Sequence, residues 1–434
     1  MLVEFRVGNH RSLRDEQVLT MEAGKGFDPK DPRPRKVKGW RKPLLPVVAL
    51  YGANASGKSN VLAALRYMQD MVAYSHYHLG PEQGVPQDSF AWGPDKQKPS
   101  LYEATFIVNG TRYEYGFEVA NGVFSEEWLF AWPKGKKQTW LERDGMKFGY
   151  GDHFKGENKT IERVTRPNAL FLSVAAQHGH PSLSVINLWL RSLYIPRVGP
   201  SVLGQMFDVH PLSELALFIS RRMSQHEQTG PMAELAKTEM ELFQRFRSLI
   251  QSSDVGIIDI ELRTDHGDTA REGQRKLMVQ HQNQNQGGNA WLPIEQESQG
   301  TQTLFRIGIP IVRALVNGGV LVADELEASL HPMLAQQIIA QFNHPSTNPK
   351  NAQLIFTTHD TNLLGPVDGE PTLRRDQVWF TEKDQDGATV LYPLTDYKPR
   401  KAENLERGYL QGRYGAIPFL GQFHLNGVAQ NGAS

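Results

Sequence analysis

Residues 52–59 read Gly-Ala-Asn-Ala-Ser-Gly-Lys-Ser and match the pattern G-x-x-x-x-G-K-[ST]. In this pattern, glycines let successive backbone N–H groups turn inward around an anion, the lysine reaches the β- and γ-phosphates of a nucleotide, and the last hydroxyl binds Mg²⁺. An apolar run over 44–50 precedes the loop, and a helix-forming run over 60–68 follows it. The segment therefore predicts a buried strand, a phosphate-binding loop and a helix whose positive dipole end faces the phosphates. The nucleotide-binding residues predicted from this match are Gly52, Asn54, Ala55, Ser56, Gly57, Lys58, Ser59 and Asn60.

Two carboxylates, Asp324 and Glu325, follow the apolar run 320–323. Parallel sheets bind ligands at the carboxyl ends of their strands, so this position suits acidic groups with a chemical role. Transfer of a phosphoryl group to water needs a metal ion to balance charge and a base to orient the water. We predict that Asp324 holds Mg²⁺ through water and that Glu325 is the base. An acidic pair at a strand end also suits a helix cap or a turn, but the upstream phosphate loop favours the catalytic interpretation.

Two further segments suit the same chemistry. Ser298-Gln299-Gly300 precedes a helical run over 303–316, and a helix that starts with Ser and Gly offers either an anion-binding end or an ordinary N-cap. His359 follows the apolar strand 353–358. There it can donate to the γ-phosphate or to the attacking water, or it can be a plain surface histidine.

The composition limits the classes of function. The chain has 434 residues, with 47 Lys and Arg against 47 Asp and Glu, so no overall basic field attracts nucleic acid or a membrane. It has no cysteine, which excludes disulfides, zinc–thiolate sites and cysteine nucleophiles. No apolar run approaches the roughly 18 residues that span a bilayer, and residues 1–6 read as a strand rather than a signal peptide. We therefore expect a cytoplasmic protein without membrane contact.

The chain divides into four expected units. Alternating runs separated by Asn109-Gly110 and Asn121-Gly122 predict an antiparallel sheet after the phosphate loop. Helical periodicity follows over 212–223 and 232–250. Beyond Trp291 the pattern is again strand–helix–strand, so a parallel α/β core sheet is assembled from both ends of the sequence. The units are an N-terminal lobe with the phosphate loop and antiparallel sheet (1–195), a helical and β-hairpin insertion (196–288), a C-terminal lobe (289–395) and a tail (396–434).

The order of these motifs resembles that in ABC-type ATPases of the SMC, RecF and OLD group. More narrowly, 324–332 and the tail segment 408–418 resemble the RloA or abortive-infection ATPases, a group that includes the ATPase subunit of the PARIS anti-phage defence system. The resemblance covers most of the chain and is weakest over 65–290. It implies an α/β fold of the ABC-type P-loop ATPase head, with a parallel core sheet, an antiparallel β subdomain and a helical insertion. The segments that carry it are the phosphate loop through Asn60, Ser298 to Gln302, Asp324-Glu325, Glu327 to Pro332 and Thr357 to Asp360.

The resemblance also implies how these residues act. In such heads the phosphate loop, acidic pair and histidine of one copy meet the Ser298-Gln299-Gly300 segment of a second copy across bound ATP, so we expect a homodimer or a higher oligomer. Glu325 becomes the general base, and His359 becomes the γ-phosphate switch. Gln177, at the end of a run read as a strand, corresponds to the Mg²⁺-sensing glutamine, with simple polar capping as the alternative. Arg11 stands where related heads contact nucleotide, and is equally compatible with a surface arginine.

The biological role that the resemblance implies is a sensor or scaffold switch in a bacterial abortive-infection system. OLD nucleases carry a Toprim domain after the ATPase, whereas only a short tail follows His359. We therefore expect the effector, for which a Toprim-type nuclease is one option, on a separate chain, under the control of a phage trigger protein.

Two alternatives remain open at this stage. The main one is a RecF-like DNA-repair or DNA-processing ATPase that acts on DNA directly. A transporter subunit is disfavoured because residues 298–302 read Ser-Gln-Gly-Thr-Gln rather than Ser-Gly-Gly-Gln. The tail interleaves cations with Tyr397, Tyr409 and Tyr414, which suits nucleic acid, a partner protein or simple packing. Whether nucleic acid is bound is left open by the sequence.

Overall fold

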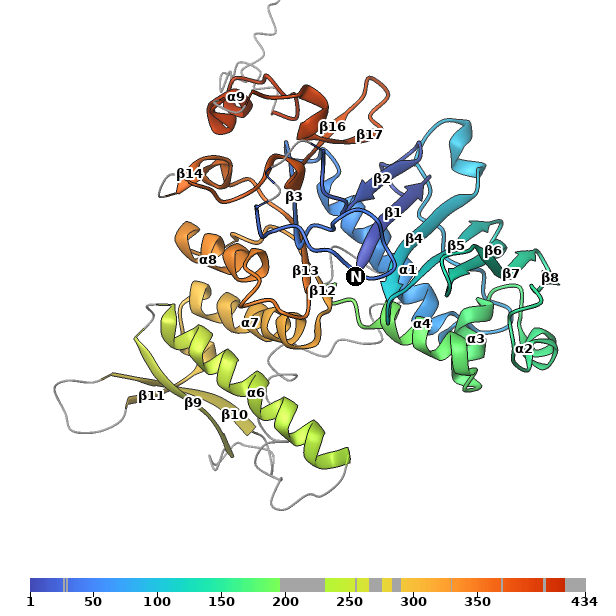
Figure 1. Cartoon of the computed structure of the whole chain (residues 1–434), viewed down its shortest axis with the longest axis horizontal. Coiled ribbons are helices and arrows are strands. Elements are labelled where there is room, and N and C mark those ends of the chain that lie inside the picture. Colours follow the sequence, from blue (N-terminus) through green and yellow to red (C-terminus); the bar gives the residue numbers. More distant parts are fainter. Residues whose placement is uncertain are drawn as a thin grey trace, which may run out of the picture.

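The structure is a computed structural model, and it describes residues 1–25, 28, 30–195, 231–253, 256–264, 275–282, 290–328, 330–367, 370–400 and 403–417. Figure 1 shows three regions side by side. An antiparallel sheet, blue to teal, lies on one side of a core of strands and helices. A smaller helix-and-sheet insertion, yellow-green, lies on the other side.

The core sheet combines strands from the two ends of the chain. Its strand order is β12-β13-β3-β16-β17, in which the first four strands are parallel and β17 is antiparallel. The first three of these strands are fully buried, as expected of a parallel sheet covered on both faces. The prediction of a parallel sheet assembled from both ends is therefore confirmed. The strands are β3 (Val47–Gly52), β12 (Val320–Ala323), β13 (Gln353–Thr357), β16 (Val378–Lys383) and β17 (Thr389–Pro393).

The second sheet is antiparallel and has the order β2-β1-β4-β5-β6-β7-β8. Two of its hairpins turn at Asn109-Gly110 and Asn121-Gly122, where both residues have positive φ, as a type I′ turn requires. These are the turns that the sequence predicted. The strands are β1 (Leu2–Gly8), β2 (Gln17–Thr20), β4 (Ser100–Val108), β5 (Thr111–Ala120), β6 (Val123–Trp132), β7 (Gln138–Asp144) and β8 (Lys147–Gly149).

Helices cover the inner face of this sheet. They are α1 (Lys58–His78), α2 (Asn158–Val164), α3 (Phe171–Gln177) and α4 (Pro181–Arg191). One hydrophobic cluster joins α1, α3, α4, the antiparallel sheet and one face of the core sheet. Glu127 of β6 lies inside it, ion-paired to Arg143 at 3.3 Å, and accepts hydrogen bonds from the first backbone N–H groups of α3. The run that ends at Gln177 is thus a helix, and the strand expected there was wrong.

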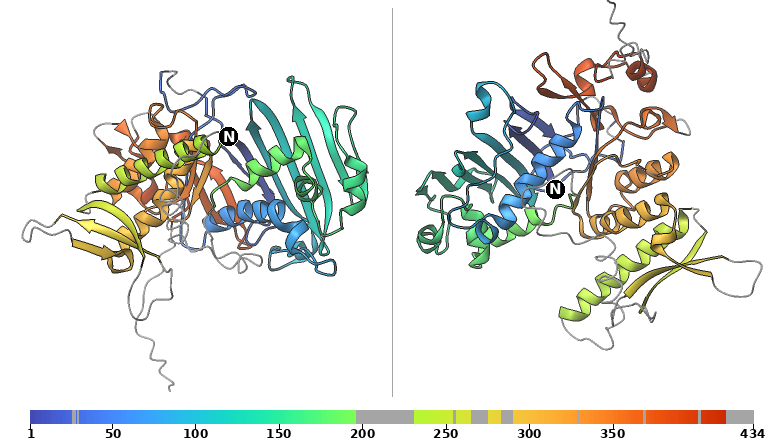
Figure 2. Two further views of the ribbon diagram at one scale, coloured as in Figure 1. Left: turned by 90° about the horizontal axis from the view of Figure 1, so that it is seen from below. Right: turned by 180° about the vertical axis from the view of Figure 1, so that it is seen from behind.

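The insertion projects from the core, as both views in Figure 2 show. It contains α6 (Pro231–Ser252) and the antiparallel strands β9 (Ile257–Thr264), β10 (Arg275–His281) and β11 (Ala290–Pro293). Because β11 pairs with β10, this sheet extends past the boundary expected at 288. The helical run expected over 212–223 lies outside the described residues.

The other face of the core sheet is covered by α7 (Gln299–Asn317), α8 (Pro332–Asn343) and α9 (Leu405–Leu410), which share a second hydrophobic cluster with α6. A small hairpin of β14 (Pro366–Val367) and β15 (Glu370–Pro371) follows β13. No helix in the described part of the chain is long and apolar enough to span a membrane. The fold is therefore α/β, with a parallel core sheet, an antiparallel β subdomain and a helical insertion, as the sequence predicted.

Candidate functional site

The phosphate loop connects β3, the middle strand of the core sheet, to α1. Two of its glycines are required by close approach. A Cβ at Gly52 would lie 2.5 Å from the Thr381 hydroxyl of β16, and a Cβ at Gly57 would lie 2.1 Å from the Thr389 hydroxyl of β17. Ala55 has a φ of 63°, a left-handed conformation that costs a residue with a side chain roughly 1–2 kcal/mol. The phosphate loop therefore adopts a turn that is unfavourable for the backbone of Ala55.

Hydroxyl groups from distant segments hold this loop in place. The Ser56 hydroxyl bonds to that of Thr381 at 2.6 Å, and the Thr389 hydroxyl donates to the Ser56 carbonyl at 2.8 Å. Ser12 bonds to Thr389 at 2.7 Å and accepts from the Asn60 amide at 2.6 Å. Sequence reasoning missed Ser12, Thr381 and Thr389. No local sequence pattern marks the two threonines for this task, because they lie more than 300 residues from the phosphate loop in sequence.

Arg11 lies in the same turn as Ser12, beside the phosphate loop. Its backbone has a φ of 51°, and its guanidinium is 3.3 Å from Asp88. The structure therefore brings Arg11 near the loop but engages its charge in an ion pair at the rim. A nucleotide contact from Arg11 stays a prediction.

Lys58 begins α1 and is only 6 % exposed. Its ammonium donates to the carbonyls of Gly52 at 2.9 Å and Ala53 at 3.1 Å. Burial lowers the pKa of Lys58, while the nearby carboxylates of Asp324 and Glu325 act in the opposite direction. A cation held inside the loop in this way is placed to meet phosphate oxygens.

A chain of hydrogen bonds joins the phosphate loop to the acidic pair. The Ser59 hydroxyl donates to both oxygens of Asp324, at 3.0 and 3.1 Å. The hydroxyl of the fully buried Thr357 donates to Asp324 at 2.6 Å and accepts from the Glu325 backbone N–H at 2.7 Å. Residues from α1, β12 and β13 therefore converge at one edge of the sheet. Thr357 is a second positioning residue that the sequence did not single out.

Glu325 and His359 stand at this same edge. Glu325 is exposed and has a φ of 48°, so its carboxylate leaves the strand end in a direction that an extended backbone would not give. The exposed His359 follows β13, and its backbone N–H donates to Glu327 at 2.5 Å. The loops after β12 and β13 are therefore tied together. The structure brings the predicted base and switch residues together with Lys58 and Ser59.

The Ser298-Gln299-Gly300 segment starts α7. The Ser298 hydroxyl accepts from the Thr301 backbone N–H at 3.1 Å, so it is an N-cap, and both Ser298 and Gln299 are exposed. The helix α7 ends directly before β12, the edge strand of the core sheet. In that sheet, β13 separates β12 from β3. The segment is thus open to a partner rather than folded onto its own phosphate loop.

Gln177 does not join the group. It is exposed at the end of α3, and the ring of the next residue, His178, lies 6.2 Å from that of His76. His76 is near the far end of α1, 18 residues beyond Lys58, which corresponds to roughly 27 Å of helix. The structure therefore does not bring Gln177 to the phosphate loop, because the run that carries it packs as a helix at the opposite end of α1, and its role at Mg²⁺ stays a prediction.

Comparison with protein-family models decides the family. Residues 47–365 match the model described as "AAA domain, putative AbiEii toxin, Type IV TA system". The chain belongs to this family. The match spans the phosphate loop, the signature-like segment, the acidic pair and His359, so this family member is an ATPase by descent. No curated protein matched it.

Three solved structures are similar to this family member over most of its length. An SMC head bound to the C-winged helix domain of ScpA has 13 % identity and a TM-score of 0.49, covering 90 % of this chain and 97 % of that one. The SMC head domain from Thermotoga maritima has 12 % identity and a TM-score of 0.37, covering 90 % and 98 %. A Pyrococcus furiosus Smc head with an extended coiled coil, bound to the C-terminal domain of ScpA, has 11 % identity and a TM-score of 0.43, covering 95 % and 98 %. These values mark a distant resemblance, from which no function follows.

The residues at the sheet edge fit a magnesium ion. The Ser59 hydroxyl and the Asp324 carboxylate are in direct contact at 3.0 Å, and oxygen ligands of this kind are those that Mg²⁺ prefers. Within the described residues, no group of three or more His, Asp or Glu side chains could hold a metal ion alone. That suits an ion held by one or two protein oxygens together with nucleotide phosphates.

The described part of the tail is packed rather than open. Tyr409 and Tyr414 are buried, and both rings stack on Phe380 of β16. The Tyr414 hydroxyl donates to Glu403 at 2.7 Å, while Tyr397 is still 45 % exposed. Two of the three tail tyrosines therefore serve packing and cannot stack on bases, which favours the simple-packing alternative for this segment.

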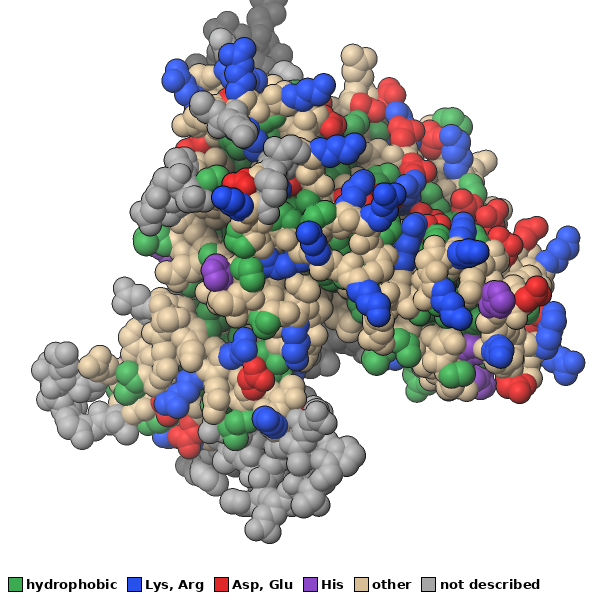
Figure 3. All heavy atoms as spheres, viewed as in Figure 1, with side chains coloured by type: hydrophobic (Ala, Val, Ile, Leu, Met, Phe, Trp, Pro, Cys, Tyr) green, Lys and Arg blue, Asp and Glu red, His purple; other side chains and the backbone are tan. Residues whose placement is uncertain are grey.

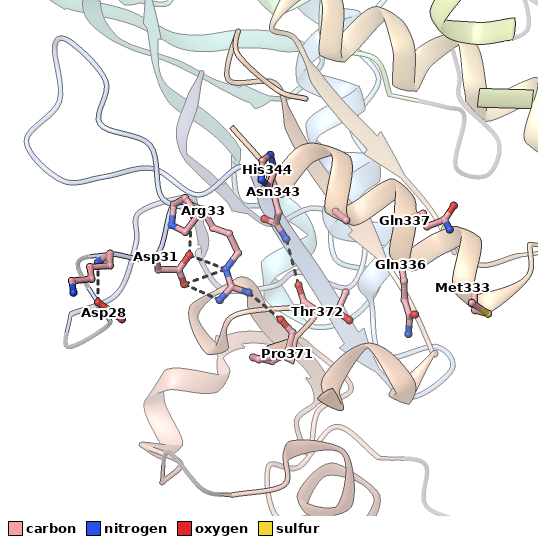
Figure 4. Close-up of a pocket in the computed structure, with 13 residues that line it drawn as sticks. Asp28, Asp31, Arg33, Met333, Gln336, Gln337, Asn343, His344, Pro371 and Thr372 are labelled. Atoms are coloured by element: carbon pink, nitrogen blue, oxygen red, sulfur yellow. Dashed lines mark hydrogen bonds and ion pairs between the residues drawn. The ribbon is translucent and has the colours of Figure 1, made fainter. Parts of the chain in front are cut away.

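A separate groove of about 870 Å³ lies between α8, residues 28–33 and residues 371–372 (Figure 4). It is lined by none of the phosphate-loop residues and by neither carboxylate of the acidic pair. Arg33 crosses one wall, bonded to Asp31 and to the Pro371 carbonyl. The groove is therefore distinct from the candidate nucleotide site.

Proposed function

We propose that this protein binds ATP with Mg²⁺ at the phosphate loop and hydrolyses it slowly, as a conformational switch. The observation that carries the proposal is the hydrogen-bonded chain from Ser59 through Asp324 and Thr357 to Glu325. It links the phosphate-binding element to an exposed carboxylate that is free to orient water. Such a link is what hydrolysis of a bound nucleotide needs.

Each residue has a distinct task in this proposal. Lys58 and the N–H groups of the loop bind the β- and γ-phosphates, and Ser59 with Asp324 holds the magnesium ion. When bound, the ion neutralises charge on the phosphates. Glu325 accepts a proton from the attacking water. The exposed His359 donates a hydrogen bond toward the γ-phosphate. Because the backbone N–H of His359 donates to Glu327, this contact couples the γ-phosphate to the loop after β12.

The site is proposed to be completed by a second copy. Ser298, Gln299 and Gly300 stand at the start of α7, which leads into the edge strand β12, and Ser298 and Gln299 are exposed. Two heads facing each other would place this helix start against the γ-phosphate bound by the partner, where its N-terminal dipole favours an anion. ATP would then stabilise a homodimer, or a higher oligomer built from such dimers.

The proposed biological role is a sensor or scaffold in bacterial anti-phage defence. The family description names an abortive-infection toxin and a toxin–antitoxin system, which supports a defence setting. In this role the ATP-bound oligomer holds a separate effector, with a Toprim-type nuclease as one candidate, until a phage protein triggers release. The cytoplasm is the proposed location.

The test is to measure the mass of the protein purified with its genomic neighbour, with and without ATP and Mg²⁺. Glu325→Gln should trap an ATP-bound oligomer that carries the neighbour, whereas Lys58→Ala, which cannot hold the phosphates, should not respond to ATP. A Glu325→Gln protein that stays monomeric and unpartnered contradicts the switch. If its turnover then rises only on addition of DNA, the RecF-like alternative replaces the proposal.

A further inference from the structure

The loop over residues 25–42 concentrates positive charge in a chain whose net charge is zero. It contains eight Lys and Arg against only two acidic residues, Asp28 and Asp31. Its residues 30–42 precede β3, and the pairing of Arg35 with Leu44 places them at the amino edge of the core sheet. The phosphate loop lies at the carboxyl edge, one strand of roughly 20 Å away. The position of the basic loop therefore allows a role that is separate from nucleotide binding.

The second half of the loop alternates between buried and exposed residues. Val37 and Trp40 turn inward onto a small hydrophobic cluster with Val3, Leu44 and Ile107. Four exposed cations flank these two residues: Lys36, Lys38, Arg41 and Lys42. This alternation leaves the cations on the surface, where the aliphatic stem of Lys38 lies over Gly110 of the β4–β5 turn.

Buried anchors hold the backbone of the loop. Arg35 is buried and donates to the Asn343 carbonyl at the end of α8 at 2.7 Å, and its backbone pairs with Leu44 on both sides. The Trp40 indole donates to Glu22 at 2.9 Å, with the Arg112 guanidinium 4.7 Å from its ring. The charges are therefore displayed on a preorganised surface, so a ligand would bind without the full entropic cost of ordering it.

The loop's own carboxylates do not neutralise the exposed cations. Asp31 is bonded to Arg33, as Figure 4 shows, and also to Arg374. Burial acts to raise the pKa of Asp31, but these two guanidinium groups lower it to about 2. The Asp31 carboxylate is therefore charged and paired with Arg33 and Arg374 rather than with the exposed cations. Asp28 accepts from the backbone N–H of Lys30. Lys42 pairs with Glu22.

In the second half of the loop, three cations have no carboxylate partner among the described residues: Lys36, Lys38 and Arg41. In Figure 1 the loop crosses the face turned to the viewer, near the N-terminus. Figure 3 shows Lys and Arg side chains gathered over the same region.

We propose that residues 30–42 of this basic loop bind the phosphate backbone of nucleic acid without sequence preference. Lysine contacts to phosphate need no apolar anchor and no specific base, and they gain affinity from the release of counterions. Protein interfaces, in contrast, are depleted in lysine and use aromatic side chains as anchors. Here the loop's tryptophan is turned inward and locked, and every unpaired projecting side chain is a cation. The surface chemistry thus favours nucleic acid over an acidic protein.

The expected strength follows from the number of contacts. Three phosphates neutralised by Lys36, Lys38 and Arg41 give a slope of log affinity against log salt of about −2.7 for duplex DNA. Raising salt fourfold, from 50 to 200 mM, then weakens binding about 40-fold. Because the loop is at the edge opposite the phosphate loop, ATP should neither compete with nucleic acid nor be displaced by it.

The test measures fluorescence anisotropy of labelled 30-base duplex DNA, single-stranded DNA and RNA with the full chain at several salt concentrations. The variant Lys36→Glu/Lys38→Glu/Arg41→Glu should bind at least about tenfold more weakly at 100 mM salt and lose most of the salt slope. The matched control Lys134→Glu/Lys136→Glu/Lys155→Glu reverses three exposed lysines elsewhere, with the same change in net charge. It should bind like the wild type.

Several results would overturn the proposal. Equal losses in the test and control variants would mean that net charge alone matters. No binding by the wild type at 50 mM salt would exclude a nucleic-acid site. Binding of poly-glutamate in preference to all three nucleic acids would assign the surface to an acidic protein instead. Retention of ATP binding by both variants shows that they are folded, and it keeps the outcome separate from that of the proposed switch.

Discussion

Thr357→Val removes one hydroxyl while keeping the shape of a fully buried side chain. That hydroxyl donates to Asp324 and accepts from the Glu325 backbone N–H, so two partners lose a hydrogen bond at once. A bond to a carboxylate contributes about 2 kcal/mol and a bond to a backbone amide about 1 kcal/mol, so we expect the folded state to lose about 3 kcal/mol.

The larger effect should be on turnover. Glu325 is held at a left-handed φ of 48°, and the bond from its N–H is one of the contacts that fix it there. A displacement of about 1 Å at a reacting group costs about 100-fold in rate. We therefore expect kcat for ATP to fall about 100-fold, while affinity for ATP, which depends on the phosphate loop, changes less than about threefold.

The assay is steady-state ATP hydrolysis beside titration with a fluorescent ATP analogue. Thr357→Ser is the control, because it keeps the hydroxyl and should retain kcat within about fivefold, the loss of one methyl group costing about 1 kcal/mol of stability. A folded Thr357→Val protein with kcat close to that of the wild type would refute the claim that this hydroxyl positions the acidic pair.

Three further predictions concern other parts of the structure. Gly57→Ala places a methyl group 2.1 Å from a hydroxyl, so calorimetry should find ATP affinity reduced at least about tenfold. Asp31 has a pKa of about 2 against an ordinary value of 3.8, so it stabilises the fold above pH 4 by about 2 kcal/mol and loses this as pH falls toward 2. Asp31→Asn should therefore flatten the acid side of a urea-midpoint profile. Glu127→Gln leaves the buried Arg143 guanidinium without its counter-charge, which should cost about 3 kcal/mol in thermal unfolding.

These predictions have clear contrary outcomes. Gly135→Ala also forces a positive φ, but in an open turn, and equal loss of ATP binding there would mean that strain, not the clash, explains Gly57→Ala. An unchanged profile between pH 5 and 3 for Asp31→Asn would show that its ion pairs contribute nothing. An unfolding temperature for Glu127→Gln within about 1 °C of the wild type would show that the buried pair is replaceable.

The core of the site could be predicted because its residues are contiguous in sequence. The phosphate loop and the Asp324-Glu325 pair each follow an apolar strand, and parallel strands bring such ends to one edge. The hairpins at Asn109-Gly110 and Asn121-Gly122 were predictable for the same local reason, since few residues other than Asn and Gly tolerate their backbone.

The parts that failed depend on tertiary contacts. Residues 171–177 are apolar with no polar alternation, so strand and helix could not be separated by periodicity over so short a run. They form a helix because the Glu127 carboxylate, 44 residues earlier, accepts its first N–H groups. The supports of the phosphate loop, Thr381 and Thr389, are more than 300 residues away in sequence, and no local pattern marks a threonine for that task.

Those distant supports have a consequence for how the protein is made. Ser56 leaves the ribosome 325 residues before Thr381 and 333 residues before Thr389, and both are needed to hold its loop. During synthesis the growing chain therefore carries a complete phosphate-loop sequence without a complete phosphate-loop structure. Nucleotide capture, and with it any assembly that ATP stabilises, is therefore expected only after Thr381 and Thr389 have been added to the chain. A nascent or truncated chain would in this way be kept from joining, and from poisoning, an oligomer of finished subunits.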